Sequence, residues 1–189
     1  MTKNHTMLDL ETFGTSPGSV IRSIGAVTFS LDGQVGKTFY VNVDKQSCLS
    51  VGLTVDPKTE QWWAEQSAAA QQSFLSPAPI SLEAACIEFR QWFHQQSAPM
   101  LWGQGANFDP PLLEAAFKAA NVAVPWKFFN VRDTRTVYDL FAFDTRDLVR
   151  KRIHHNALDD AIHQVALVAA ALRKGRAAES TPVEEGLFG

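Results

Sequence analysis

The stretch TMLDLET (residues 6–12) decides the fold, because apolar residues recur along it at alternate positions until Gly14 interrupts the pattern. Such alternation predicts a β-strand that ends in a loop. Side chains alternate across a strand, so Asp9 and Glu11 project from one face while Leu8 and Leu10 occupy the other. The strand therefore carries two carboxylates on one face close to its end.

Strand patterns and helix patterns interleave along the rest of the chain. The β-rich runs at 20–31 and 37–43 flank Asp32-Gly33, which is a hairpin signal. Further strands are predicted at 100–102 and 126–131. Helices are predicted at 58–75, at 110–120 and at 156–174. Two more helices are expected to begin at Ser81, which would serve as a cap, and at Asp133-Thr134. This order predicts an α/β fold with a mixed sheet flanked by helices.

Length and composition indicate one domain followed by a short tail. At 189 residues, 46% hydrophobic and 20% charged, the chain can bury a single substantial core. We expect the domain to span residues 1–175 and the polar residues 176–189 to form a disordered tail. The net charge of −3 lacks the basic footprint of many nucleic-acid-binding proteins. Acidic residues gathered at a metal site would account for this balance, so net charge does not exclude a nucleic-acid partner.

Cysteine content and hydropathy indicate a cytoplasmic protein. Cys48 and Cys86 lie far apart and outside any Cys-x-x-Cys motif, which favours neither a disulfide framework nor a zinc site. No apolar run reaches the roughly eighteen residues that a membrane span needs, and the first residues lack a signal-peptide pattern. We therefore expect no membrane partner.

The acidic residues of the chain suggest a metal site. Asp9 and Glu11 on one strand face would repel each other unless a cation offset their charge, and Mg²⁺ or Mn²⁺ prefers such oxygen ligands. Asp109 and Asp160 also follow or begin predicted elements and could complete the ligand set. Two divalent ions held in this way can activate water and stabilise the leaving oxygen of a phosphodiester. A neutral His155 nearby could accept a proton near pH 7.

Three motifs in order resemble the DEDDh superfamily of 3′-5′ exonucleases: LDLET at 8–12, NFD at 107–109 and the five-residue spacing from His155 to Asp160. The stretches TEQWW at 59–63 and NVRDTRT at 130–136 are similar to the branch that contains a phage DNA exonuclease and a bacterial exoribonuclease. The resemblance covers residues 5–173 and implies a ribonuclease H-like fold. It also implies two metal ions on Asp9, Glu11, Asp109 and Asp160, with His155 as general base.

The implied activity is removal of nucleoside 5′-monophosphates from the 3′ end of single-stranded nucleic acid. An endonuclease of the ribonuclease H kind, with the same site, is a second enzymatic interpretation, although the histidine of the third motif argues against it. A protein of a different class, a catalytically idle module that binds nucleic acid or a replication partner, is a further alternative. The sequence leaves the choice between DNA and RNA open, because no motif reports a contact to the 2′-hydroxyl.

The third motif can be aligned in two ways, with His154 and Asp159 or with His155 and Asp160. If Asn156 caps the last helix, Asp159 is the third helical residue and can serve the free amides there. That structural task for Asp159 favours the pair of His155 and Asp160, and so does the resemblance.

Several residues near these motifs are candidates for substrate binding. Aromatic rings can stack on bases and arginines can bind phosphate, although each of these side chains could equally be a core or solvated residue. The candidates are Thr12, Phe13, Phe108, Trp62, Trp63, Arg132 and Arg135. A basic cluster at 146–152 (Arg146, Arg150, Lys151 and Arg152) could also steer the substrate into the site.

Two protein contacts are suggested outside the site. The tail ends in Leu187-Phe188-Gly189, and its apolar pair is similar to the ending of sliding-clamp peptides, although Glu184 stands where those carry glutamine. The helix that carries Trp92-Phe93 could pair with its copy in a homodimer.

Overall fold

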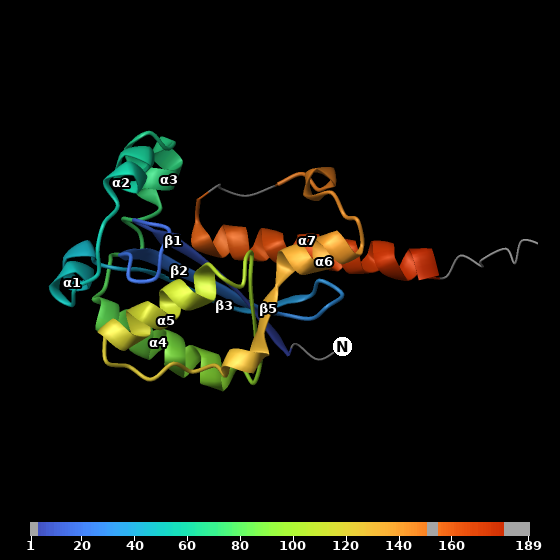
Figure 1. Cartoon of the computed structure of the whole chain (residues 1–189), viewed down its shortest axis with the longest axis horizontal. Helices are drawn as coiled ribbons and strands as arrows, with labels where there is room; N and C mark the ends of the chain where they lie inside the picture. The colour runs from blue at the N-terminus through green and yellow to red at the C-terminus, as the bar shows by residue number, and fades with distance from the viewer. Residues whose placement is uncertain (1–3, 151–154, 180–189) are drawn as a thin grey trace, which may run out of the picture.

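The computed structural model describes residues 4–150 and 155–179, with side chains as far as Ala177, and a five-stranded sheet forms its centre (Figure 1). The strands are β1 (His5–Thr12), β2 (Ile21–Phe29), β3 (Val35–Asn42), β4 (Met100–Gly103) and β5 (Val131–Asp133). Their order in space is β3-β2-β1-β4-β5. The first three pair antiparallel, whereas β4 and β5 run parallel to β1, which confirms the predicted mixed sheet.

Helices cover both faces of the sheet (Figure 1). One face packs against α4 (Leu82–Gln95) and α5 (Asp109–Ala119), and Leu8 and Leu10 of β1 belong to this core. The other face packs against α7 (Ala157–Glu179) beside α6 (Thr134–Leu140), and Met7 of β1 belongs to that second core. Strand alternation therefore directs Asp9 and Glu11 to the α7 face.

A glycine brings α7 close to the central strands. A Cβ on Gly25 of β2 would lie 2.2 Å from the carbonyl carbon of Ala157 and 2.3 Å from the nitrogen of Leu158. Only a residue without a side chain permits this approach of helix backbone to strand. Since Gly25 is paired with Asp9 in the sheet register, the contact places the first turn of α7 over the β1 carboxylates.

The predicted helix at 58–75 is two helices in the structure, α2 (Pro57–Ala64) and α3 (Ala68–Gln72). Ser67 ends the continuity, because its hydroxyl accepts a hydrogen bond from the Ala70 amide and starts α3 as an N-cap. A further short helix, α1 (Lys45–Ser50), precedes them. The predicted caps of two other helices are confirmed, since Ser81 Oγ accepts from the Ala84 amide at 3.2 Å and Asp133 Oδ1 accepts from the Arg135 amide at 2.7 Å.

The predicted strand at 126–131 is wrong. Phe128–Asn130 forms a 3-10 turn, and β5 begins only at Val131. The aromatic residues in this stretch suggested a strand, but Trp126 is buried among the rings of Phe89, Phe93 and Phe117 as part of a core cluster.

The last helix is longer than predicted. It continues through Gly175 to Glu179, so residues 176–179 are helical and do not belong to a tail. Gly175 serves close packing, since a Cβ there would lie 2.3 Å from the ring of Phe141. The remaining tail residues, 180–189, which include the proposed clamp-binding ending, lie outside the described residues.

Other expectations concern surfaces and cysteines. Cys48 and Cys86 are free and buried. Phe93 is buried, and Trp92 packs on Phe39 and Phe89, so this aromatic pair contributes to the core, while a homodimer through this helix stays a prediction. Within the described ranges, no helix has the length and apolar character needed to cross a membrane.

Candidate active site

The predicted acidic residues line one cavity. Asp9 and Glu11 come from β1, Asp109 is the first residue of α5, and Asp160 lies in the first turn of α7. The cavity has a volume of about 460 Å³. Its walls are formed by Asp9, Leu10, Glu11, Thr15, Gln104, Asn107, Phe108, Asp109, Arg135, His155, Asp160 and Gln164. The fold therefore brings together residues from four separated parts of the sequence.

Asp109 is held under the cavity by the backbone. Its Oδ1 accepts a hydrogen bond from the Leu10 amide at 3.2 Å, and the residue is almost fully buried. A Cβ on Gly103 would lie 3.2 Å from Asp109 Oδ2, so the glycine at the end of β4 leaves room for this carboxylate. The N-cap of α5 is Phe108, which makes no side-chain cap hydrogen bond. Asp109 is therefore not the N-cap of α5.

Three side chains in the cavity meet the geometry of a metal site. One ligand atom from each of Glu11, His155 and Asp160 lies within 4.8 Å of the other two. Asp9 and Asp109 line the same cavity but do not belong to this closest group. Carboxylate oxygens and an imidazole nitrogen suit a divalent cation such as Mg²⁺ or Mn²⁺, and the donor set therefore fits the predicted ions.

Burial and mutual repulsion disfavour the charged carboxylates in the absence of a cation. Burial, followed by the Asp109 carboxylate, raises the pKa of Glu11 to about 8. Burial raises the pKa of Asp109 to about 7, and burial with the charges of Asp109 and Glu11 raises the pKa of Asp9 well above its usual range. A bound divalent cation would reverse this cost, since it favours the charged forms.

Two polar residues that the motifs did not reveal hold the carboxylates. Gln164 Nε2 donates a hydrogen bond to Asp9 Oδ1 at 2.7 Å, and Arg150 forms an ion pair with Asp160. Gln164 lies one helical turn after Asp160, so the i, i+4 spacing on an amphipathic helix was the available signal. Arg150 belongs to the predicted basic cluster, but the sequence did not reveal that its partner is Asp160 at the start of α7. Lys151 and Arg152 of that cluster lie outside the described residues.

His155 stands at the start of α7 in a left-handed backbone conformation, with φ of 61°. Its ring meets the ring of Trp62 edge to face, with centroids 4.9 Å apart, and that of Trp63 at 6.0 Å. Asn156 caps the helix as predicted, because its Oδ1 accepts from the Asp159 amide at 3.1 Å. Asp160, by contrast, lines the cavity. His154, the histidine of the alternative alignment, lies outside the described residues.

A second, smaller cavity adjoins the carboxylates and is walled mainly by apolar groups. Its volume is about 400 Å³. Its walls are Leu10, Glu11, Thr12, Gly14, Thr15, Lys58, Thr59, Trp62, Trp63 and Phe108. Trp63 is buried and its Nε1 donates to the Thr12 carbonyl at 2.8 Å, whereas Trp62 remains 41% exposed. Four predicted substrate-binding residues, Thr12, Trp62, Trp63 and Phe108, thus surround one pocket.

The other predicted substrate-binding residues separate. Arg135 lines the carboxylate cavity, but Arg132 turns away and donates to the carbonyls of Phe129 and Val131. Phe13 packs against a core cluster beneath the guanidinium of Arg22, and it lines neither cavity. The structure therefore brings Arg135 to the site and leaves Phe13 and Arg132 outside it.

Solved structures with a similar fold include a 3′-exonuclease, exonuclease I and Pop2p of S. pombe. A full-length 3′-exonuclease aligns with 93% of this chain, with a TM-score of 0.59 and 10% sequence identity. E. coli exonuclease I in complex with a dA16 oligonucleotide also aligns with 93% of this chain, with a TM-score of 0.63 and 16% sequence identity. Pop2p of S. pombe in a Mg²⁺- and Mn²⁺-bound form aligns with 95% of this chain over 86% of its own length. The TM-score is 0.60 and the sequence identity is 12%. This chain spans 62% of the 3′-exonuclease and 42% of exonuclease I. No curated protein matches the chain in sequence.

The five-stranded mixed sheet with helices on both faces defines the class of protein, one with a ribonuclease H-like fold. A sequence-family model then specifies the member within this class. The model, described as a 3′-5′ exoribonuclease Rv2179c-like domain, matches residues 4–172, and the chain belongs to this family.

Proposed function

We propose that this protein is a metal-dependent 3′-5′ exonuclease that hydrolyses the last phosphodiester bond of single-stranded nucleic acid and releases nucleoside 5′-monophosphates. The observation that carries the proposal is the convergence of Glu11, His155 and Asp160 within 4.8 Å, in a cavity also lined by Asp9 and Asp109. Membership of an exoribonuclease family supports it further.

Different side chains of the site would bind metal ions, orient the metal ligands and accept a proton. Asp9, Glu11, Asp109 and Asp160 would hold two divalent ions, either Mg²⁺ or Mn²⁺, which when bound supply Lewis acidity and neutralise charge at the phosphodiester. Gln164 and the Leu10 amide fix the orientation of two of these carboxylates. His155 offers a ring nitrogen within 4.8 Å of ligand atoms of Glu11 and Asp160, and we assign to it the uptake of a proton from the attacking water and not metal ligation.

The neighbouring pocket suits the terminal nucleoside. Its walls carry two indole rings and a phenyl ring, against which a base and sugar can lie. We further propose RNA as the preferred substrate, because the match to the exoribonuclease family is one of sequence, whereas the likeness to the DNA-bound exonuclease I is one of fold.

A strand-shortening assay tests this function. RNA and DNA oligonucleotides of one sequence, labelled at the 5′ end, would be incubated with Mg²⁺ or Mn²⁺ and either the wild type or Asp9→Ala. A ladder that shortens from the 3′ end and is absent with Asp9→Ala is the expected result, with RNA shortened faster. If the correctly folded wild type shortens neither strand with either metal, the exonuclease proposal is overturned.

The idle binding module is the second candidate, and chelation separates the two. A module that merely binds would retain its affinity for an oligonucleotide in EDTA and would release no mononucleotide in Mn²⁺. An exonuclease loses turnover in EDTA and recovers it when Mn²⁺ is restored. The retained set of four carboxylates and His155 around one cavity favours the enzyme.

A further inference from the structure

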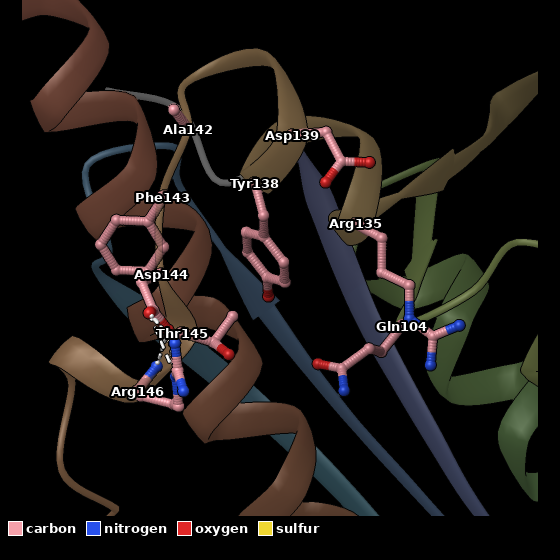
Figure 2. Close-up of a pocket in the computed structure, with 9 residues that line it drawn as sticks. All are labelled: Gln104, Arg135, Tyr138, Asp139, Ala142, Phe143, Asp144, Thr145 and Arg146. Atoms are coloured by element: carbon pink, nitrogen blue, oxygen red, sulfur yellow. Dashed lines mark hydrogen bonds and ion pairs between the residues drawn. The ribbon is translucent and has the colours of Figure 1, made fainter.

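A third cavity, of about 690 Å³, opens beside the carboxylate cavity on the side of α6 (Figure 2). Gln104 and Arg135 line both cavities, so the two adjoin at these side chains. Its remaining walls are Tyr138, Asp139, Ala142, Phe143, Asp144, Thr145 and Arg146. The volume lies within the range of roughly 300–1,000 Å³ found for ligand pockets. Of the residues that line this cavity, the sequence analysis singled out Arg135 as a substrate-binding candidate and Arg146 as part of the basic cluster.

The guanidinium of Arg135 is available to a ligand. Arg135 is exposed at the start of α6, and among residues 4–150 and 155–179 its side chain forms no ion pair or hydrogen bond. Arg146 across the cavity differs, because its Nε and Nη2 bind the Asp144 carboxylate at 3.0 and 2.7 Å (Figure 2). In the described wall, Arg135 is therefore a positive charge without an ion-pair or hydrogen-bond partner, and its field reaches the Asp109 carboxylate of the neighbouring cavity.

The cavity also offers polar and aromatic groups from the same helix. Tyr138 follows Arg135 by three residues, so both side chains lie on one face of α6. Tyr138 is buried, and its hydroxyl points toward the space between Gln104 and Thr145 in Figure 2. A hydroxyl in the wall of a cavity can donate a hydrogen bond to a phosphate or sugar oxygen of a bound strand.

The three cavities have different chemistry. The apolar one beside Trp62 suits the base and sugar of one nucleotide, and the carboxylates suit a phosphate with its metal ions. A strand that passes through the site must continue beyond the cleaved bond, and that continuation carries further phosphates. The cavity at Arg135 provides a cation and hydrogen-bonding groups, which phosphate and sugar require.

We propose that the cavity formed by Gln104, Arg135 and Tyr138 binds the nucleotide on the 5′ side of the scissile bond, with Arg135 contacting its phosphate. This inference rests on the proposed exonuclease function and specifies the path of the substrate. It makes Arg135 a residue that positions the strand. Asp139 lines the same cavity, and its negative charge should lower the affinity of the cavity for phosphate.

A substrate that lacks the preceding nucleotide provides the test. In the p-nitrophenyl ester of a nucleoside 5′-monophosphate, p-nitrophenol occupies the place of the preceding nucleotide. We would compare kcat/KM for this ester with kcat/KM for an oligonucleotide of the same base and sugar. Arg135→Ala is expected to lower the ratio of oligonucleotide to ester about tenfold or more, since a charge-assisted hydrogen bond to the strand is lost.

Two variants sharpen the comparison. Asp139→Asn removes a negative charge from the cavity wall and should raise the same ratio, and Tyr138→Phe should lower it by removing only the hydroxyl. Arg90→Ala is the charge-matched control, because Arg90 is exposed on α4 and lines none of the three cavities; it should leave the ratio unchanged. The effect of Arg135→Ala should shrink at high salt, as expected for a phosphate contact.

The outcomes separate the two levels of inference. Equal loss on ester and oligonucleotide with Arg135→Ala would assign Arg135 to the reaction centre and overturn the binding role of the cavity. An unchanged ratio in both Arg135→Ala and Asp139→Asn would overturn it as well, while the exonuclease function stands. If the wild type hydrolyses neither substrate, the proposed function fails and the inference fails with it.

Discussion

Gln164 on α7 donates a hydrogen bond of 2.7 Å to Asp9 on β1, across 155 residues of sequence. The bond ties the last helix to the first strand at the point where the carboxylates gather. Gln164 is almost fully buried, and its Oε1 has no hydrogen-bond partner within the described chain. Its amide group therefore serves chiefly to orient Asp9.

The first prediction concerns this bond. Gln164→Ala should lower kcat/KM for oligonucleotide hydrolysis about 10- to 100-fold, because residues that orient metal ligands have effects of this size. The same variant should raise the Mn²⁺ concentration needed for half-maximal activity. Ala166→Ser, at an exposed position on the same helix, is the matched control. Wild-type kinetics and metal dependence in Gln164→Ala would show that Asp9 needs no such support.

The second prediction concerns Gly25. Gly25→Ala should lower the free energy of unfolding by about 1–3 kcal/mol or more, because the new methyl group would overlap the backbone of Ala157. Since the displaced turn carries Asp160, activity per folded molecule should also fall. Urea denaturation followed by circular dichroism measures the first effect, and Thr38→Ala on the exposed part of β3 serves as control. Stability equal to that of the wild type would contradict the close packing of α7 on β2.

The third prediction distinguishes the neighbouring tryptophans. Trp63 is buried and bonded to the Thr12 carbonyl, so Trp63→Ala should cost about 3–5 kcal/mol of stability. Trp62 is partly exposed beside His155, so Trp62→Ala should leave stability nearly unchanged while raising KM for oligonucleotides. Thermal unfolding and steady-state kinetics on both variants decide the point. A large loss of stability with Trp62→Ala and an increase in KM alone with Trp63→Ala would contradict this assignment.

The fourth prediction concerns pH and metal. The pKa of Glu11 is raised from 4.5 to about 8, so between these values the folded protein retains a proton that the unfolded chain has released. The folded state then binds more protons, and its stability falls as pH rises through this window. In EDTA the melting temperature should therefore decline from pH 5 to pH 8. Saturating Mn²⁺ should reduce the decline, because the cation favours the ionised carboxylates.

Glu11→Gln provides the control for that experiment. Without the titrating carboxyl, its melting temperature in EDTA should depend less on pH over the same window. Asp144→Asn, which alters an exposed ion pair, should keep the wild-type slope. Identical slopes for the wild type in EDTA and in Mn²⁺ would contradict a metal site at the carboxylates.

Local patterns predicted much of the fold because they report short-range physics. Alternation in residues 6–12 predicted which faces of β1 carry Leu8 and Asp9, and the caps Ser81 and Asp133 were visible as single residues. The predictions were wrong at residues whose type is explained by tertiary packing and not by local secondary structure. Trp126 belongs to a core cluster and not to a strand. Gly175 does not end the last helix, because it makes room for the ring of Phe141 within that helix.

The sequence by itself determined the residue types of the site and the strand face that carries the first two carboxylates, because strand periodicity is a local property. Only the tertiary structure decided that Gln164 contacts Asp9, that Arg150 pairs with Asp160, and that Arg135 stands between two cavities. These relations depend on how α6 and α7 pack on the sheet, which no local pattern encodes.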